Sequence, residues 1–137
     1  MLLEALIGIL IFTIGIVGLM GMQTAANRAT ADMKYRSEAA LFAEQIVNQM
    51  WADDHSALET SYASPGGPKY VVWRNAVSAS STGLPGSTGA NFPTVVVVQG
   101  AQGVNPTSSM VSVTVRWQGP GEAAPHQYQL MTSIPPI

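Results

Sequence analysis

The run Asp53-Asp54-His55 is the group of side chains that comes nearest to an acid–base or metal-binding cluster. Adjacent residues of a helix point in different directions, so these three side chains cannot converge on one ion without a change of backbone direction. We therefore expect this run to be the solvated end of a helix.

The serine and glycine runs provide no stronger catalytic candidate. Ser80-Ser81 and Ser108-Ser109 lie in loop-like sequence, and no histidine or other base is near them in the sequence. The glycines from Gly83 to Gly89 lack the lysine and the spacing of a phosphate-binding loop. These runs give no reason to predict nucleophilic catalysis or nucleotide binding.

The composition excludes further classes of chemistry. The 137 residues include no cysteine, which removes disulfides, thiolate metal sites and cysteine nucleophiles. Only two histidines are present, His55 and His126, and they are far apart in the sequence. Six Lys and Arg against eight Asp and Glu, with no basic cluster, argue against a nucleic-acid partner. We predict that the chain is not an enzyme and uses no metal and no cofactor.

Glu4 is the side chain that we single out, because of the segment in which it lies. From Met1 to Met22 it is the only charge, and Thr13 is the only other polar side chain. As a helix this run reaches ~33 Å, enough to cross the hydrocarbon core of a bilayer. The first basic residue is Arg28, so the basic start of a secretory signal peptide is missing. We predict a retained membrane-spanning helix, in which a carboxylate is costly and tends to be functional. The alternative is an acid favoured only by the helix dipole.

The glycines of the same segment invite a similar comparison. Gly8, Gly15, Gly18 and Gly21 recur at helical spacing, and small residues permit close approach of two helices in a bilayer. Each also lowers helix stability by ~1 kcal/mol relative to alanine, which would favour local unwinding of the helix. The alternative is the ordinary glycine content of membrane helices.

The helical pattern continues without a break after the apolar segment. From Gln23 to about Ala52 there is no proline or glycine, and good helix formers dominate. We therefore predict one helix of ~50 residues, from near Leu2 to about Asp53. Its second half is predicted to carry an apolar stripe of Ala26, Ala29, Met33, Ala40, Phe42 or Ala43, Val47, Met50 and Trp51.

The remaining sequence is predicted to form a small body that covers this stripe. Ser64 to Pro68 is a strong break, and Tyr70 to Ser81 could be a strand or a short helix, of which we favour the helix. Thr82 to Pro93 is predicted to be a loop rich in turn formers. The aromatic residues of this body are predicted to be core residues rather than a ligand platform: Trp73, Trp117 and Tyr128.

Three strand patterns follow in the last third of the chain. Thr94 to Gln99 holds four consecutive valines, which predicts a strand buried on both faces. Met110 to Trp117 alternates, with Val111, Val113, Val115 and Trp117 predicted inward, and Gln127 to Ile134 alternates more weakly. Short connections around Gly103 to Pro106 and Gly119 to Gly121 predict an antiparallel meander.

The first twelve residues, Met1 to Phe12, resemble the mature N-terminal segment of type IV pilins and type II secretion pseudopilins. In that segment a few apolar residues precede one glutamate, and an apolar helix follows. The glycine-spaced run from Ile14 to Gln23 is similar to the minor pilins of the PilV type. Three later stretches are also similar to that family: Ala39–Met50, Leu84–Gly86 and Val113–Trp117.

The resemblance implies an α+β, pilin-like fold, with a long protruding N-terminal helix packed on a small antiparallel sheet. Residues 1–27 would be the membrane-spanning and assembly half of the helix. Residues 28–137 would be a periplasmic globular head that includes the amphipathic second half. The family's glutamate lies one residue further from the cleaved N-terminus than Glu4 lies from Met1. We therefore expect the mature protein to begin one residue before Met1, with an N-methylated residue that follows a basic leader ending in glycine.

The function implied is that of a minor pilin, which assembles through its hydrophobic N-terminal helix and helps to initiate or cap a type IV pilus, a fibre of adhesion and twitching motility. Its partners would be other minor pilins, the major pilin and, for the precursor, prepilin peptidase. It would sit in the inner membrane with a single span before it joins the fibre or tip at the cell surface. The residues expected to serve subunit assembly are Leu2, Leu3, Glu4, Leu6, Gly15, Gly18 and Gly21, with Glu4 paired to the N-terminal amine of an adjacent subunit.

Two other functions stay open on the sequence. The same architecture would suit a minor pseudopilin of a type II secretion system. A membrane-tethered periplasmic binding or catalytic domain would need a convergent polar pocket, for which the predicted head offers few ionisable residues: Lys69, Arg74, Arg116, Glu122 and His126.

Overall fold

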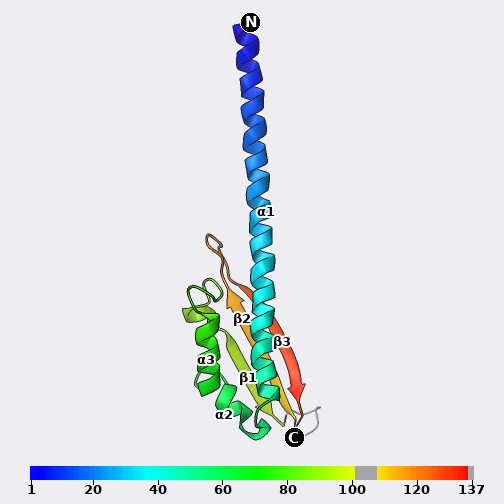
Figure 1. Ribbon diagram of the computed structural model, residues 1–137, viewed down its shortest axis with the longest axis vertical. Coiled ribbons are helices and arrows are strands. Elements are labelled where there is room, and N and C mark those ends of the chain that lie inside the picture. Colours follow the sequence, from blue (N-terminus) through cyan, green and yellow to red (C-terminus); the bar gives the residue numbers. More distant parts are fainter. Residues whose placement is uncertain (101–107, 136–137) are drawn as a thin grey trace. The chain divides into compact units, whose positions relative to one another are not determined.

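The computed structural model describes residues 1–100 and 108–135 (Figure 1). Within them the chain forms one long helix, several short helical segments and a three-stranded sheet. In chain order the elements are α1 (Leu2–Trp51), η1 (His55–Ala57), α2 (Leu58–Tyr62), α3 (Pro68–Val77), η2 (Gly89–Asn91), β1 (Thr94–Gln99), β2 (Ser109–Trp117) and β3 (His126–Ile134).

The single long helix predicted from the sequence is confirmed. α1 is continuous over 50 residues and ends two residues before the predicted Asp53. The chain divides into two compact units, Met1–Lys34 and Tyr35–Ile137, and α1 contributes to both. In the first unit every residue as far as Thr30 is exposed. The threonine hydroxyls there donate to helix carbonyls, for example Thr13 to Leu10 at 2.8 Å.

The strands form an antiparallel sheet in the order β1-β2-β3. Val113 in the middle of β2 pairs with Val95 of β1 and with Leu130 of β3. The long helix packed on this sheet confirms the predicted α+β arrangement, and the strands lie within one residue of their predicted bounds. The predicted turn around Gly103 to Pro106 lies outside the described residues.

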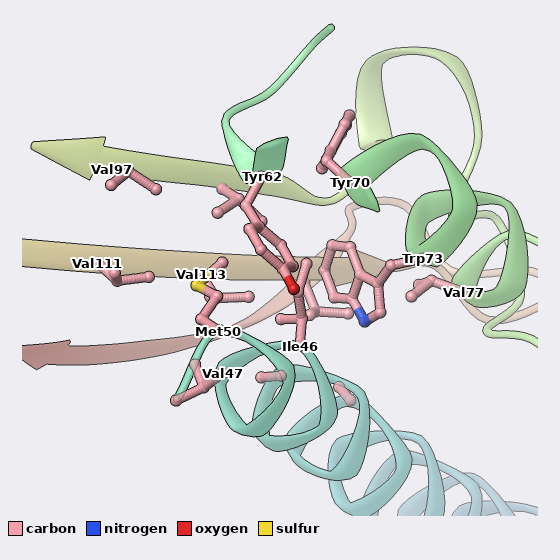
Figure 2. Close-up of a cluster of buried hydrophobic side chains, with 14 of the residues drawn as sticks. Ile46, Val47, Met50, Tyr62, Tyr70, Trp73, Val77, Val97, Val111 and Val113 are labelled. Carbon is pink, nitrogen blue, oxygen red and sulfur yellow. The ribbon is translucent and has the colours of Figure 1, made fainter. Parts of the chain in front are cut away.

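The core of the second unit lies between the sheet and the helices (Figure 2). The four predicted inward residues of β2 are all buried. α1 contributes a stripe at helical spacing: Ala39, Ala43, Ile46, Val47 and Met50.

The stripe predicted for α1 is therefore only partly correct. Met33 and Trp51 are exposed, whereas Ala39 and Ile46 are buried although the prediction did not include them. For Met33 the reason is that the buried stripe begins only within the second unit, at Ala39. Apolar residues such as Ala26 and Ala29 lie on the first unit, in which nothing packs on them.

The prediction that β1 is buried on both faces is wrong. Val95 and Val97 are buried at 1% and 5% exposure, whereas Val96 and Val98 are 52% and 48% exposed. In the part of the chain that the structure describes, the helices cover one face of the sheet, so alternate valines stay outside the core. A run of identical residues carries no alternation from which this could be predicted.

Short helices complete the unit. α3 confirms the helix favoured for Tyr70 to Ser81, with Pro68 at its first turn. Trp73 and Trp117 are core residues as predicted, and Tyr128 is half-buried against the core. η1 and α2 were not predicted, and neither was η2, which lies within the predicted loop from Thr82 to Pro93. Gly83 packs so closely beneath α3 that a Cβ there would lie 2.2 Å from the carbonyl oxygen of Val77.

Candidate functional site

The strongest candidate site is the surface of α1 around Glu4. Glu4 lies in the first turn of α1, where the free backbone N–H groups favour an acid. The other side chains of this part of the helix are apolar, and Leu6, Leu10 and Phe12 are each more than half exposed. Glu4 is therefore a single carboxylate among exposed apolar side chains.

Helical geometry places Glu4 and three glycines on one face. At about 100° per residue, Gly8, Gly15 and Gly18 lie within about 40° of the direction of Glu4. Gly21 lies about 100° away from it. We call the face with Glu4, Gly8, Ile11, Gly15 and Gly18 the glycine face.

No contact among residues 1–100 and 108–135 explains these glycines. A Cβ added at Gly8, Gly15, Gly18 or Gly21 would meet nothing within 4 Å. Alanine would stabilise the helix at each position by ~1 kcal/mol, and no packing among the described residues offsets this cost. Glycines on one face allow the backbone of a second helix to approach closely.

The seven residues predicted to serve assembly do not share one face. Glu4, Gly15 and Gly18 belong to the glycine face, whereas Leu2 and Leu6 point about 160° away and Leu3 about 100° away. The leucines are all exposed and so remain available to lipid or to other neighbours. Gly8 and Ile11 were not in the predicted set, although a projection of the sequence at 100° per residue would have included them.

The segment that carries this face could span a membrane. An 18-residue window of α1 has a mean hydropathy of 2.5, and none of it is buried in the chain. A core helix of a soluble protein would be mostly buried, which this window is not. The internal hydrogen bonds of Thr13 and Thr24 satisfy the hydroxyls that a membrane would otherwise leave without water.

The run Asp53-Asp54-His55 forms structural contacts and no shared site. Asp53 accepts hydrogen bonds from Lys69 and from the Tyr62 hydroxyl, the latter at 2.7 Å. These bonds, that of Lys69 first, lower the pKa of the Asp53 carboxyl. Burial, and secondarily the Asp53 carboxylate, raises the pKa of Tyr62.

The other two members of the run face elsewhere. The Asp54 carboxylate accepts from the Ser56 N–H at 2.9 Å and from the Ser56 hydroxyl at 2.7 Å, which caps η1 and lowers the pKa of Asp54. His55 Nδ1 donates to the Pro135 carbonyl oxygen at 2.6 Å. The three side chains therefore diverge, as the sequence predicted, but each has a defined partner.

The other parts of the second unit bring few polar side chains together. No group of three His, Asp or Glu side chains that could hold a metal was found among residues 1–100 and 108–135. One hollow of about 270 Å³ is lined by Leu41 and Phe42 together with three polar residues, Glu38, Gln45 and Thr82. A second, of about 240 Å³, is lined almost entirely by apolar side chains such as Val96 and Met131. Ser109 begins β2 and is buried, so it does not belong to an exposed loop.

Comparisons with family models, with curated proteins and with solved structures found no match.

Proposed function

We propose that this chain is a minor pilin subunit, which assembles through its hydrophobic N-terminal helix and helps to initiate or cap a type IV pilus. The observation that supports this most directly is the exposed apolar half of α1, with a lone carboxylate on the same face as three unexplained glycines. In this function the chain waits in the inner membrane with its second unit in the periplasm. Its partners are other minor pilins and the major pilin, and prepilin peptidase acts on its precursor.

Glu4 acts as a device that sets the register between subunits. In the membrane its carboxylate lies near the cytoplasmic interface, where water solvates it. In a bundle of apolar helices that water is lost, and an unpaired carboxylate is strongly unfavourable. The available cation is the N-terminal amine of an adjacent mature subunit. Such a buried pair contributes little net stability, but removal of one member costs ~3–5 kcal/mol.

The glycine face brings the two helices close enough for this pairing. Gly8, Gly15 and Gly18 form a strip on the side of α1 that carries Glu4, and Ile11 is the one large side chain in this strip. Packing along this strip lets the neighbouring backbone approach and directs it toward the carboxylate. The leucines on the other sides face lipid or further neighbours.

The test is the subunit content of sheared pili, measured together with the level of the chain in the membrane fraction. Glu4→Ala and Glu4→Gln should insert and fold normally but be depleted from the fibre. The matched control is Glu44→Ala, which removes an exposed glutamate from the second half of the same helix and should be incorporated normally.

Two results would contradict the proposal at different points. Normal incorporation of Glu4→Ala would refute the pairing and leave Glu4 as an acid at a helix end. Absence of the unmodified chain from sheared pili, in cells that produce them, would refute the pilus function itself.

A further inference from the structure

The two edges of the sheet differ in the backbone hydrogen bonds that they make outside the sheet. β1 and β3 are the edge strands. At β1 the edge is partly closed, because the Ser64 N–H donates to the Val95 carbonyl oxygen at 2.9 Å and the Val95 N–H donates to the Ser64 hydroxyl at 3.3 Å. Along β3 from Gln127 to Ile134, the described residues show no backbone hydrogen bond other than those to β2.

The register identifies which backbone groups of β3 are open. Val95 uses its N–H and C=O toward Ser64, so these groups point away from β2. In an antiparallel pair the hydrogen-bonded and non-bonded positions alternate, so Val113 opposite Val95 directs its own groups to β3. Leu130, which pairs with Val113, therefore bonds to β2. By the same alternation the groups of Gln129 and Met131 point to the free edge.

The side chains along this edge do nothing to protect it. Natural edge strands commonly carry lysine, other charges or proline to prevent pairing with a further strand. The eight residues from Gln127 to Ile134 contain none of these. On the core side Tyr128 and Leu130 are only half-buried, and on the other side Met131 is exposed. A strand laid beside β3 would cover apolar surface on both faces.

We propose that the edge of β3 is a docking site for an extended, uncharged segment of another protein, which adds to the sheet as a fourth strand. Alternating donors and acceptors along a straight edge are satisfied by an extended backbone and by no compact ligand. A charged side chain placed beside Tyr128 or Leu130 would lose water without gaining a partner, so the segment is neutral where it faces the core.

A second copy of this chain is the less suitable occupant. The self-complementary pairing of two β3 edges is antiparallel, and it reverses the direction of every element in the second copy, including the part of α1 that packs on the sheet. Two copies anchored in one membrane share one direction. This exclusion depends on the membrane anchoring in the proposed function, whereas the open edge itself does not.

The test uses the full-length chain in detergent micelles and a synthetic nine-residue peptide of alternating valine and threonine with blocked ends, an uncharged strand probe whose sequence is unrelated to β3. We expect saturable binding, with amide exchange at Gln129 and Met131 slowed about tenfold or more at saturation. Gln129→Pro removes an outward N–H without removing a bond to β2, and it should weaken binding about tenfold. Gln129→Ala keeps the N–H and should bind as the unmodified chain does.

A second probe keeps the test decisive if Gln129→Pro does not fold. A peptide of the same sequence with N-methyl groups along both edges cannot pair with a strand and should not bind. No saturable binding in the millimolar range, equal binding of the N-methylated peptide, or equal binding by a folded Gln129→Pro variant would overturn the proposal. Self-association of the unmodified chain that Gln129→Pro abolishes would assign the edge to a second copy, and would also overturn it. None of these results depends on whether the chain enters a pilus.

Discussion

Trp73 of α3 donates its indole N–H to the main-chain carbonyl oxygen of Phe42 in α1 at 2.9 Å. The two residues are 31 positions apart, and the bond is part-buried, with the Trp73 side chain itself only 3% exposed (Figure 2). It connects the second half of α1 to α3, whose buried side chains Tyr70, Trp73 and Val77 belong to the same core as the α1 stripe. α3 is thereby held to α1 by a directional contact as well as by burial.

Trp73→Phe should lower the free energy of unfolding of the second unit by about 1–3 kcal/mol, from the lost hydrogen bond and the smaller ring. The measurement is urea unfolding of the full-length chain in detergent micelles, followed by circular dichroism. Trp51→Phe is the matched control, since Trp51 is 45% exposed. Its effect should stay within about 0.5 kcal/mol. Equal effects of the two substitutions would contradict the role given to this bond.

Asp53 should make the stability of the second unit sensitive to acid. Its pKa is lowered from 3.8 in the folded chain, chiefly by the hydrogen bond from Lys69 and then by that from Tyr62. A group with a lowered folded pKa contributes stability above its unfolded pKa, and this contribution is lost as the pH falls through the folded value. Stability should therefore fall below about pH 4.

The comparison that isolates this effect is Asp53→Asn against the unmodified chain. The variant should be less stable at pH 7 and should lose less stability between about pH 4 and pH 2. Asp54, whose pKa is also lowered through Ser56, remains in both proteins and supplies the residual slope. Parallel stability curves over this pH range would show that the Lys69 and Tyr62 contacts do not favour the charged carboxylate.

Local sequence patterns were sufficient to predict the elements that follow a single rule, such as helix continuity or strand alternation. The absence of proline and glycine from Gln23 to Ala52 predicted the continuity of α1, and clean alternation predicted the buried face of β2. The four valines of β1 offered no alternation, and which of them face the core depends on the single layer of helices over the sheet. That layer forms only when the whole unit folds, so the residues of β1 alone do not predict it.

Contacts between distant segments could not be predicted from the sequence. The pairing of Asp53 with Lys69 spans 16 positions, and it depends on the placement of the unpredicted helix α2 between them. For the candidate site the reverse holds, because helical spacing alone puts Glu4 and Gly8 on one face. The proposed partner of these residues stays a prediction, because it is not part of this chain.

Gly83→Ala should strongly destabilise the second unit. A Cβ at this position would lie 2.2 Å from the carbonyl oxygen of Val77 and 2.6 Å from the backbone nitrogen of Ala79. Both neighbours are backbone atoms, so relief requires a movement of the loop away from the end of α3. We expect a loss of more than about 2 kcal/mol in the free energy of unfolding.

The control for this substitution is Gly66→Ala. A Cβ at Gly66 would meet nothing within 4 Å. Its effect should lie within about 0.5 kcal/mol and can be slightly favourable, because alanine restricts the unfolded chain. Similar losses in both variants, measured by thermal unfolding, would mean that the loop accommodates the extra atom.

Adjacent valines of β1 should respond in opposite ways to the same substitution. Val97→Asp places a carboxylate in the core without a partner, which costs several kcal/mol and should unfold the second unit. Val96→Asp changes the same residue type on the opposite face of the same strand, where the side chain is 52% exposed, and the chain should stay folded. Dispersed amide resonances separate the two outcomes, and a folded Val97→Asp variant would contradict the assignment of the strand's faces.

Removal of residues 1–27 should leave a soluble, monomeric and folded protein. The large exposed apolar side chains are concentrated in the deleted segment, from Met1 to Met22. The buried core belongs to the second unit, and its α1 stripe begins at Ala39, beyond the deletion. The truncated chain therefore keeps the apolar packing that stabilises the fold and loses the surface that requires lipid or a partner helix. Sedimentation velocity should report a monomer, and urea should unfold it in one cooperative transition. A truncated chain that aggregates, or that unfolds without cooperativity, would show that the first unit contributes to the stability of the second.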